Sequence, residues 1–252
     1  MVVGKTGKLV VPVLAMMVAG SCDSGTGPDG QLRDVQVAFS TTQTGAFGVA
    51  SHRVFQDDTL TSGTDTVIVT SVGIVVREVE LQRVNADDCE VNADACEKFE
   101  SGPLLVMLPL NGETEVQFSF DIPDGAYAEI ELDVHKVSGD DPEDLVFAQQ
   151  NPDFVDKSIR VEGTFNSTPF LFETDLDVEQ ELDLNPPLVV DETTGATTIT
   201  ILVDIDGWFR GGDGALVDPN SGNKGQVNEG LIKENIKQSF EAFEDDDVDG
   251  KR

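Results

Sequence analysis

The segment from Glu115 to Val137 alternates apolar and polar side chains with a period of two. Two apolar rows result, one before and one after a proline: Val116, Phe118, Phe120 and Ile122, and then Ala126, Ala128, Ile130, Leu132 and Val134. Such alternation is typical of strands with one buried face. Between the rows, Pro123, Asp124 and Gly125 have the composition of a three-residue loop. The pattern predicts a β-hairpin whose two apolar rows point into one core.

Strand-like patterns recur along the chain, at 35–39, 66–84, 104–110, 159–165, 170–184 and 197–206. Within 66–84 the apolar face switches near Arg77, which predicts a bulge there or a strand buried on both faces at Val75 and Val76. The alternation over 170–184 is too long for one typical strand and predicts a bend or a break. Its acidic face is typical of a solvated strand protected from edge-to-edge pairing.

The chain after residue 210 changes period. Asn228 is a candidate N-cap, and apolar residues follow at helical spacing: Ile232, Ile236, Phe240 and Phe243. One amphipathic helix is therefore expected to dock on the β domain, whose core Trp208 closes. These patterns together predict an all-β fold, an antiparallel β-sandwich over 32–210, followed over 211–252 by a loop, one C-terminal helix and an acidic tail.

The N-terminus has the features of an export signal. Lys5 and Lys8 precede an apolar run that is too short to span a membrane, and Ala19-Gly20-Ser21-Cys22 closes it with small residues. This tetrapeptide is typical of a bacterial lipobox, which predicts a signal peptide over 1–21 and a lipid on Cys22. Leucine is usual where Ala19 stands, so an ordinary secretory signal is the alternative. Either signal exports the protein, and residues 22–31 are expected to form a flexible tether.

The cysteine count agrees with lipidation. The chain has 3 cysteines, and a lipid on Cys22 leaves Cys89 and Cys96 as a pair in an acidic loop. In an exported protein, such a pair predicts a disulfide. A metal site is the weaker interpretation, because no histidine lies nearby in the sequence.

The formal net charge of -32, from 48 acidic and 16 basic side chains, decides which partners are expected. Phosphates would be repelled and no basic stripe offsets that repulsion, so nucleic acid is not expected as a partner. Acidity of this size is typical of a solvated surface. Cations are the one class of ligand that it favours.

Two segments match parts of a calcium-binding EF-hand loop. The first matches positions one, three, five and six of the loop: Asp245, Asp247, Asp249 and Gly250. The second matches positions one, three and twelve: Asp218, Asn220 and Glu229. The given sequence ends at Arg252, before a bidentate glutamate, and Asn223 stands where the second loop needs glycine. Calcium is therefore a candidate ligand at both segments, against the alternatives of a helix cap and an acidic tail. No other cofactor is predicted.

Three stretches resemble a group of uncharacterised bacterial lipoproteins that share a domain of unknown function. They are VIVTSVGIVVREVEL (67–81), IPDGAYAEIELDVHK (122–136) and SIRVEGTF (158–165). The resemblance spans most of 34–209, and its motifs are core and turn residues. It implies an exported β-sandwich of the transthyretin, immunoglobulin or carbohydrate-binding type, and it implies no catalytic residue.

The leading functional hypothesis is an exported, lipid-anchored, non-enzymatic protein of the bacterial cell envelope, with a role in recognition, adhesion or structure and with an envelope protein or a glycan as its partner. One alternative is calcium-dependent carbohydrate binding, for which Tyr127 is the candidate outward-facing aromatic. Another is an envelope glycoside hydrolase that uses paired carboxylates. Neither a G-x-S-x-G nor an H-E-x-x-H motif occurs, and the histidines are His52 and His135. His135 is expected on the solvent-facing side of its strand.

Overall fold

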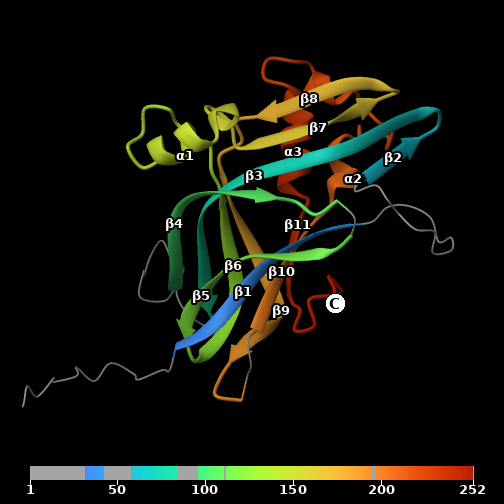
Figure 1. Cartoon of the computed structure of the whole chain (residues 1–252). Helices are drawn as coiled ribbons and strands as arrows, with labels where there is room; N and C mark the ends of the chain where they lie inside the picture. Colours follow the sequence, from blue (N-terminus) through green and yellow to red (C-terminus); the bar gives the residue numbers. More distant parts are fainter. Residues whose placement is uncertain (1–31, 43–57, 85–95, 111, 194–196, 252) are drawn as a thin grey trace, which may run out of the picture.

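The computed structural model of the chain describes residues 32–42, 58–84, 96–110, 112–193 and 197–251, and for 96–101 it describes the backbone alone. The strands in these ranges form two sheets that enclose one apolar core (Figure 1). The predicted all-β sandwich is confirmed. No helix within the described ranges is long and apolar enough to cross a membrane.

Sheet A is four-stranded, in the order β11-β10-β1-β5. Strands β1 and β10 are parallel, so the sandwich is not antiparallel throughout as predicted, and the other neighbours in this sheet are antiparallel. Sheet B has the order β8-β7-β3-β6-β9, and β2 and β4 also pair with β3. The strands of sheet A are β1 (Leu32–Thr41), β5 (Thr114–Pro123), β10 (Thr197–Val203) and β11 (Phe240–Glu244). Those of sheet B are β2 (Asp58–Ser62), β3 (Asp65–Arg83), β4 (Cys96–Met107), β6 (Gly125–Val134), β7 (Ile159–Phe165), β8 (Thr168–Thr174) and β9 (Val178–Val190).

The predicted hairpin around Pro123 is wrong, although both of its strands exist. Strand β5 pairs with β1 in sheet A, whereas β6 pairs with β3 and β9 in sheet B. The chain therefore crosses from one sheet to the other at Asp124. The inner faces of two stacked sheets point into the same core, so Ile122 and Ile130 are buried as they would be in a hairpin. Alternation determines which face of a strand is buried and does not determine its neighbours.

Strand β3 contains the predicted bulge. Its pairing with β6 shifts register between Val76 and Val79, where Arg77 and Glu78 lie opposite the single residue Asp133 and form the bulge. Val76 packs in the main core, and Val75 packs in a second apolar cluster on the opposite face of sheet B. Both alternatives drawn from the sequence are therefore confirmed: β3 is bulged at Arg77 and buried on both faces just before it.

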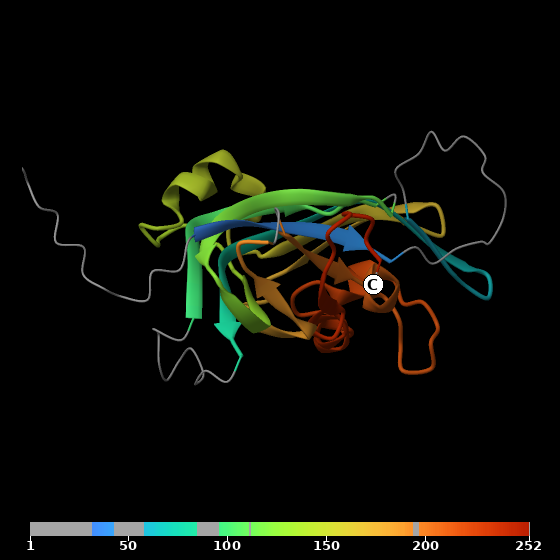
Figure 2. The same ribbon diagram turned by 90° about the horizontal axis from the view of Figure 1, so that it is seen from below.

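The segment between β6 and β7 covers that second cluster. It contains α1 (Leu145–Gln150) and the 3-10 helix η2 (Pro152–Phe154), which the sequence pattern did not predict. The rings of Phe147 and Phe154 pack edge to face, with centroids 6.5 Å apart, close to Val75. In Figure 2, α1 and the C-terminal segment lie on opposite sides of the strands.

The C-terminal helix is shorter than predicted. Helix α3 (Glu229–Lys237) ends before Phe240, and Phe240 and Phe243 belong to β11, which pairs with β10. The Ser239 hydroxyl donates to the Ile236 carbonyl at 2.7 Å and accepts the Trp208 indole N–H at 2.7 Å. Strand β11 pairs with the backbone N–H and C=O groups along the edge of β10. A helix that continued past Lys237 would leave those groups unpaired. Two further short elements precede α3: α2 (Ile205–Trp208) and η3 (Pro219–Gly222).

The predicted break in 170–184 is confirmed, because β8 ends at Thr174 and β9 begins at Val178. The two strands lie at opposite edges of the β8-β7-β3-β6-β9 order. Asp175, in the connection, accepts from Lys224 at 2.7 Å and from Lys233 at 2.6 Å, and these hydrogen bonds hold the pKa of its carboxyl well below the usual range. The pair of lysines ties the connection to the segment around α3.

Gly163 of β7 offers a test of how tightly the sheet packs. A Cβ at this position would lie 2.0 Å from the backbone oxygen of Ile68, and within 2.8 Å and 2.9 Å of the Phe170 ring. Because backbone cannot give way as a flexible side chain can, we expect Gly163→Ala to lower the free energy of unfolding by about 3 kcal/mol, as over-packing does. Urea denaturation measures the change. Gly212→Ala is the matched control, since a Cβ there meets nothing within 4 Å, and an equal loss in both variants would contradict the packing.

Candidate functional site

The outer face of sheet B carries a row of glutamates across three strands. Glu80 of β3 lies opposite Glu131 of β6, which in turn lies opposite Glu181 of β9. Like charges that face each other across a sheet repel and destabilise it. Such a row is therefore an unfavourable arrangement that the local sequence alternation alone would not reveal.

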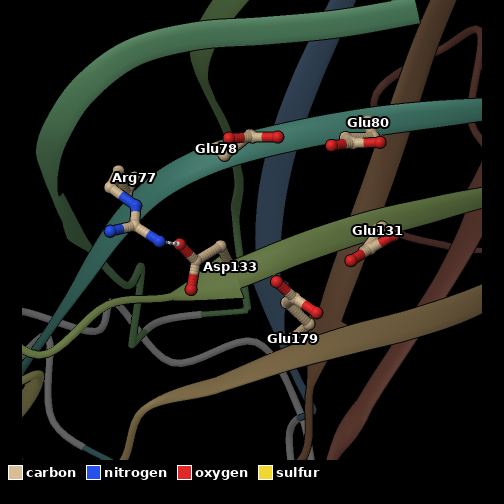
Figure 3. Close-up of a pocket in the computed structure, with 6 residues that line it drawn as sticks. All are labelled: Arg77, Glu78, Glu80, Glu131, Asp133 and Glu179. Atoms are coloured by element: carbon tan, nitrogen blue, oxygen red, sulfur yellow. Dashed lines mark ion pairs between the residues drawn. The ribbon is translucent and has the colours of Figure 1, made fainter. Parts of the chain in front are cut away.

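The bulge in β3 brings a cation to the end of this row. Arg77 Nη2 lies 2.8 Å from Asp133 Oδ2, and these two residues line a small pocket with four glutamates: Glu78, Glu80, Glu131 and Glu179 (Figure 3). The cavity holds about 30 Å³. That volume accommodates a water molecule or a single ion and is too small for a sugar ring.

Two carboxyls in the pocket are perturbed. Burial, followed by repulsion from Glu80 and Glu179, raises the pKa of Glu131 to about 7. Burial also raises the pKa of Asp133, although Arg77 acts in the opposite direction. The surroundings of both carboxyls therefore disfavour their ionised forms, mainly through burial.

His135 does not lie on an exposed surface, contrary to the prediction from alternation. Its side chain is 8% exposed, and its Nε2 donates to both oxygens of Asp144, at 2.9 Å and 3.0 Å. Asp144 is 1% exposed and also accepts the backbone N–H of Ser138. The segment that follows β6 folds back over the end of the strand and brings Asp144 onto the imidazole. No periodicity in the sequence signals this return.

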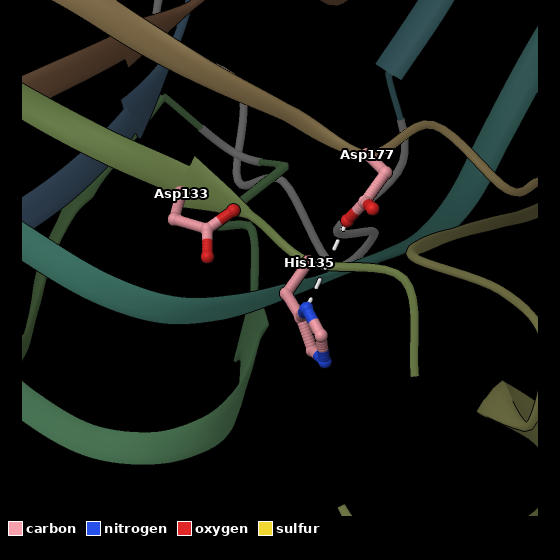
Figure 4. Close-up of side chains that lie close together, drawn as sticks. All are labelled: Asp133, His135 and Asp177. Carbon is pink, nitrogen blue, oxygen red and sulfur yellow. Dashed lines mark ion pairs between the residues drawn. The ribbon is translucent and has the colours of Figure 1, made fainter. Parts of the chain in front are cut away.

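The second ring nitrogen of His135 points toward the β8–β9 connection (Figure 4). Nδ1 lies 3.8 Å from Oδ1 of Asp177, a separation too long for a hydrogen bond. Among the described residues, this buried nitrogen has no hydrogen-bond partner. One ligand atom each from Asp133, His135 and Asp177 lies within 4.8 Å of the other two. The fold thus gathers three potential ligands from two separate stretches of chain.

The first calcium-loop candidate is gathered as predicted. One oxygen each of Asp245, Asp247 and Asp249 lies within 4.8 Å of the others. Asp245 is buried, and its carboxylate accepts hydrogen bonds from the Thr200 hydroxyl at 2.8 Å, from the backbone N–H of Asp249 at 3.1 Å and from that of Gly250 at 2.9 Å. These bonds fold the acidic segment onto sheet A without an ion, so it is not the frayed acidic tail expected as the alternative to a calcium site.

The second calcium-loop candidate has its carboxylates engaged elsewhere. Asp218 accepts the backbone N–H of Asn220 at 2.9 Å and so caps η3. Glu229 accepts the backbone N–H of Gly225 at 2.6 Å and pairs with Lys233 at 2.8 Å. The contacts of Asp218 and Glu229 are those of a helix cap and an i,i+4 ion pair.

Tyr127 is not on the outward face, so its prediction as a glycan platform is corrected. It is 0% exposed, and its hydroxyl donates to the Pro123 carbonyl at 2.8 Å. The pairing of β6 with β9 shifts register between Tyr127 and Glu129. This irregularity breaks the strict alternation, so that Tyr127 is buried together with Ile130 in the core. Trp208 is also 0% exposed, as expected.

The remaining predicted site residues lie outside the part that the structure describes. Cys22 and Cys89 are in undescribed segments, and Cys96 is described by its backbone alone. Lipidation of Cys22 and the Cys89–Cys96 disulfide therefore stay predictions.

Comparisons with protein-family models, with curated proteins and with solved structures give no match to this chain. The resemblance to bacterial lipoproteins stays a prediction, and function has to be argued from the residues themselves.

The perturbed carboxyl of Glu131 predicts a pH dependence of stability. The folded protein holds this proton up to about pH 7, whereas the unfolded chain releases it near 4.5. The contribution of the Glu131 carboxyl to the free energy of unfolding is therefore fully present below pH 4.5 and is lost as the pH rises to about 7. Because the carboxyl is only partly buried, screening limits the loss to about 1 kcal/mol.

Glu131→Gln should remove that loss, so that the variant is more stable than the wild type at pH 8 but not at pH 4. Urea denaturation in the presence of a chelator measures both values. Asp183→Asn removes the same charge from an exposed position on β9 and serves as the control. If Glu131→Gln and Asp183→Asn changed the pH dependence of stability equally, general charge repulsion, and not the Glu131 carboxyl in particular, would be responsible for the loss of stability.

Proposed function

We propose that this protein is a lipid-anchored, exported, non-enzymatic β-sandwich of the bacterial cell envelope, which displays a binding face to the periplasm or the cell exterior. The lipobox at Cys22 and the tether after it support the anchor. One observation carries the proposal. The tether joins the sandwich at one end of β6, and the candidate site at Asp133 and His135 lies at the other end.

The tether joins the sandwich at Leu32, which pairs with Pro123 beside the crossover between the sheets. Arg33 pairs with Asp124 at 3.0 Å and fastens the start of β1 there. Asp133 and His135 lie at the far end of β6, a strand of 10 residues, which spans about 33 Å. A domain held at Leu32 would therefore present Asp133 and His135 away from the membrane, as a recognition role requires.

The environment of His135 supports a non-enzymatic role. A hydrolase that used this imidazole as its base would need a hydroxyl or thiol at the nitrogen that Asp144 does not occupy. Within the described ranges, no hydrogen-bond partner lies at that nitrogen. Among the described residues, no nucleophile therefore lies within hydrogen-bond reach of the dyad of His135 and Asp144.

Calcium-dependent carbohydrate binding is less well supported. Carbohydrate sites use exposed aromatic rings as platforms, and the only tryptophan and the only tyrosine of the whole chain are both buried. A glycan partner would have to be bound through other groups.

The glycoside hydrolase alternative has a candidate location in the described structure. A cleft of about 500 Å³ adjoins the acidic pocket, and Glu78 and Glu143 are among its lining residues. This size suits a small organic ligand. Hydrolysis of a glycan panel that Glu143→Gln abolishes would overturn the non-enzymatic proposal, and we expect no hydrolysis.

The anchor is tested by changing the predicted lipidated residue. We expect Cys22→Ser to abolish acyl labelling and to shift the protein from the membrane fraction to the soluble fraction, because one lost thiol removes the acyl attachment. Metabolic labelling with a fatty acid and cell fractionation measure both effects. Cys96→Ser, which leaves the lipobox intact, should keep the label. A Cys22→Ser protein that keeps the acyl label, or that stays in the membrane fraction, would overturn the anchor.

A further inference from the structure

We propose that Asp133, His135 and Asp177 form a binding site for a divalent first-row transition metal ion, such as Zn²⁺ or Mn²⁺. The proposal goes beyond the envelope role and does not depend on it. It concerns the residues drawn in Figure 4, and neither calcium-loop segment contributes to it.

The first observation concerns Nδ1 of His135, the ring nitrogen that does not face Asp144. Because Nε2 donates its hydrogen to the Asp144 carboxylate, the neutral imidazole carries a lone pair on Nδ1. This atom is buried, and no hydrogen-bond donor is paired with it in the described part of the chain. A buried acceptor without a partner is costly. A cation at Nδ1 would remove that cost.

The second observation is the charge that surrounds this lone pair. Asp133 approaches it from β6, and Asp177 from the β8–β9 connection. Two carboxylates beside an imidazole lone pair place negative charge against negative charge. An ion bound by all three groups would replace this repulsion with attraction.

Asp144 has the position of a residue that orients a metal ligand. In metal sites, a ligating histidine donates its other ring N–H to a carboxylate or a carbonyl, which fixes the tautomer and the ring orientation. Asp144 accepts from Nε2 with both oxygens and is itself held by the backbone N–H of Ser138. The imidazole is therefore fixed before any ion is bound, with Nδ1 directed at Asp177 and a ligand atom of Asp133 within 4.8 Å.

The distance between His135 and Asp177 fits a shared ion after a small side-chain movement. Two ligands at about 2.1 Å from a tetrahedral ion are roughly 3.4 Å apart, and Nδ1 and the Asp177 oxygen are 3.8 Å apart. The Asp177 side chain is 61% exposed, so an ion can enter from solvent and water can complete the coordination. Asp177 Oδ1 also accepts the backbone N–H of Lys136 at 3.0 Å, which holds it beside the histidine.

Arg77 is the competitor for this site. It pairs with Oδ2 of Asp133 at 2.8 Å, and its own side chain is 39% exposed. The guanidinium can remain on this oxygen while Oδ1 binds the ion, or it can turn outward into solvent. Arg77, which the bulge places beside Asp133, therefore determines how much of the negative charge of Asp133 is available to a bound ion.

The donor set selects the class of metal. Calcium and magnesium prefer oxygen ligands, whereas an imidazole nitrogen suits zinc, copper, iron and nickel, and carboxylates also suit manganese. A site with one nitrogen and two carboxylates should therefore favour Zn²⁺, Mn²⁺ or the spectroscopic substitute Co²⁺ over Ca²⁺.

The test is a titration of the purified full-length chain with Co²⁺ and Zn²⁺. We expect visible Co²⁺ absorption bands that appear at one equivalent and are removed by Zn²⁺ but not by an equal concentration of Ca²⁺. Asp177→Asn should weaken Zn²⁺ binding by about 10- to 100-fold or more, because even residues behind the ligands have effects of this size. Its amide oxygen can still accept the Lys136 N–H, so the fold should be kept.

Asp183→Asn is the matched control, because it removes the same charge from the same edge of sheet B at an exposed position. Asp133→Asn is the second ligand variant. ¹⁵N spectra of His135 should show a large shift of Nδ1 on addition of Zn²⁺, with Nε2 still protonated.

Several results would overturn the proposal. One is equal weakening by Asp177→Asn and Asp183→Asn, which would mean that diffuse negative charge attracts the ions. Another is a His135 that carries protons on both nitrogens and is unchanged by Zn²⁺, which would make it a structural imidazolium between Asp144 and Asp177. Equal competition by Ca²⁺ would also overturn it. None of these results affects acyl labelling of Cys22, so the anchor succeeds or fails separately.

Discussion

The structure depends on how β3 satisfies its backbone along both edges. Its first half pairs with β2 and β7 and its second half with β4 and β6, so this one strand holds sheet B together. The change of partners is accompanied by register shifts, and the bulge of Arg77 and Glu78 against β6 turns a charged side chain onto the outer face. Burial of Val75 and Val76 on opposite faces fixes the strand on both sides of the sheet. Bulges commonly re-aim side chains near functional sites, and here the bulge does so beside Asp133.

The acidic outer face has an energetic cost that the large core must offset. A row of facing glutamates and a pocket of perturbed carboxyls reduce stability, and solvation alone does not require such a row to cross three adjacent strands. The neighbouring imidazole is fixed from behind by Asp144. Repulsion in the pocket and fixation of His135 both favour a bound cation, and both arise where the β6 end meets two connecting segments. The proposed metal site and the proposed display role therefore concern the same end of the sandwich.

Sequence patterns predicted the strands well and their neighbours poorly. The break between Thr174 and Val178, the bulge at Arg77 and the burial of Trp208 follow from local alternation, because side-chain period reports which face is buried. Alternation predicts a hairpin where the chain crosses between the sheets at Asp124. The reason is that β5 and β6 bury the same apolar side chains whether they pair with each other or lie in facing sheets. The position of Tyr127 was wrong because an irregularity in pairing with β9 is a property of two strands at once. Phe240 and Phe243 fit both a helix and a strand, and the open edge of β10 decided between them.

The sequence by itself determined the class of fold and the large negative charge, since these depend on period and composition, and it predicts an export signal from a local motif. Tertiary structure alone decided the environment of His135. Asp144 reaches its Nε2 through a segment without periodicity, and Asp177 reaches its Nδ1 from a connection 42 positions further along the chain. Contacts between distant segments depend on how sheets and loops pack as a whole. A histidine that alternation assigns to solvent can therefore become a buried side chain with its orientation fixed.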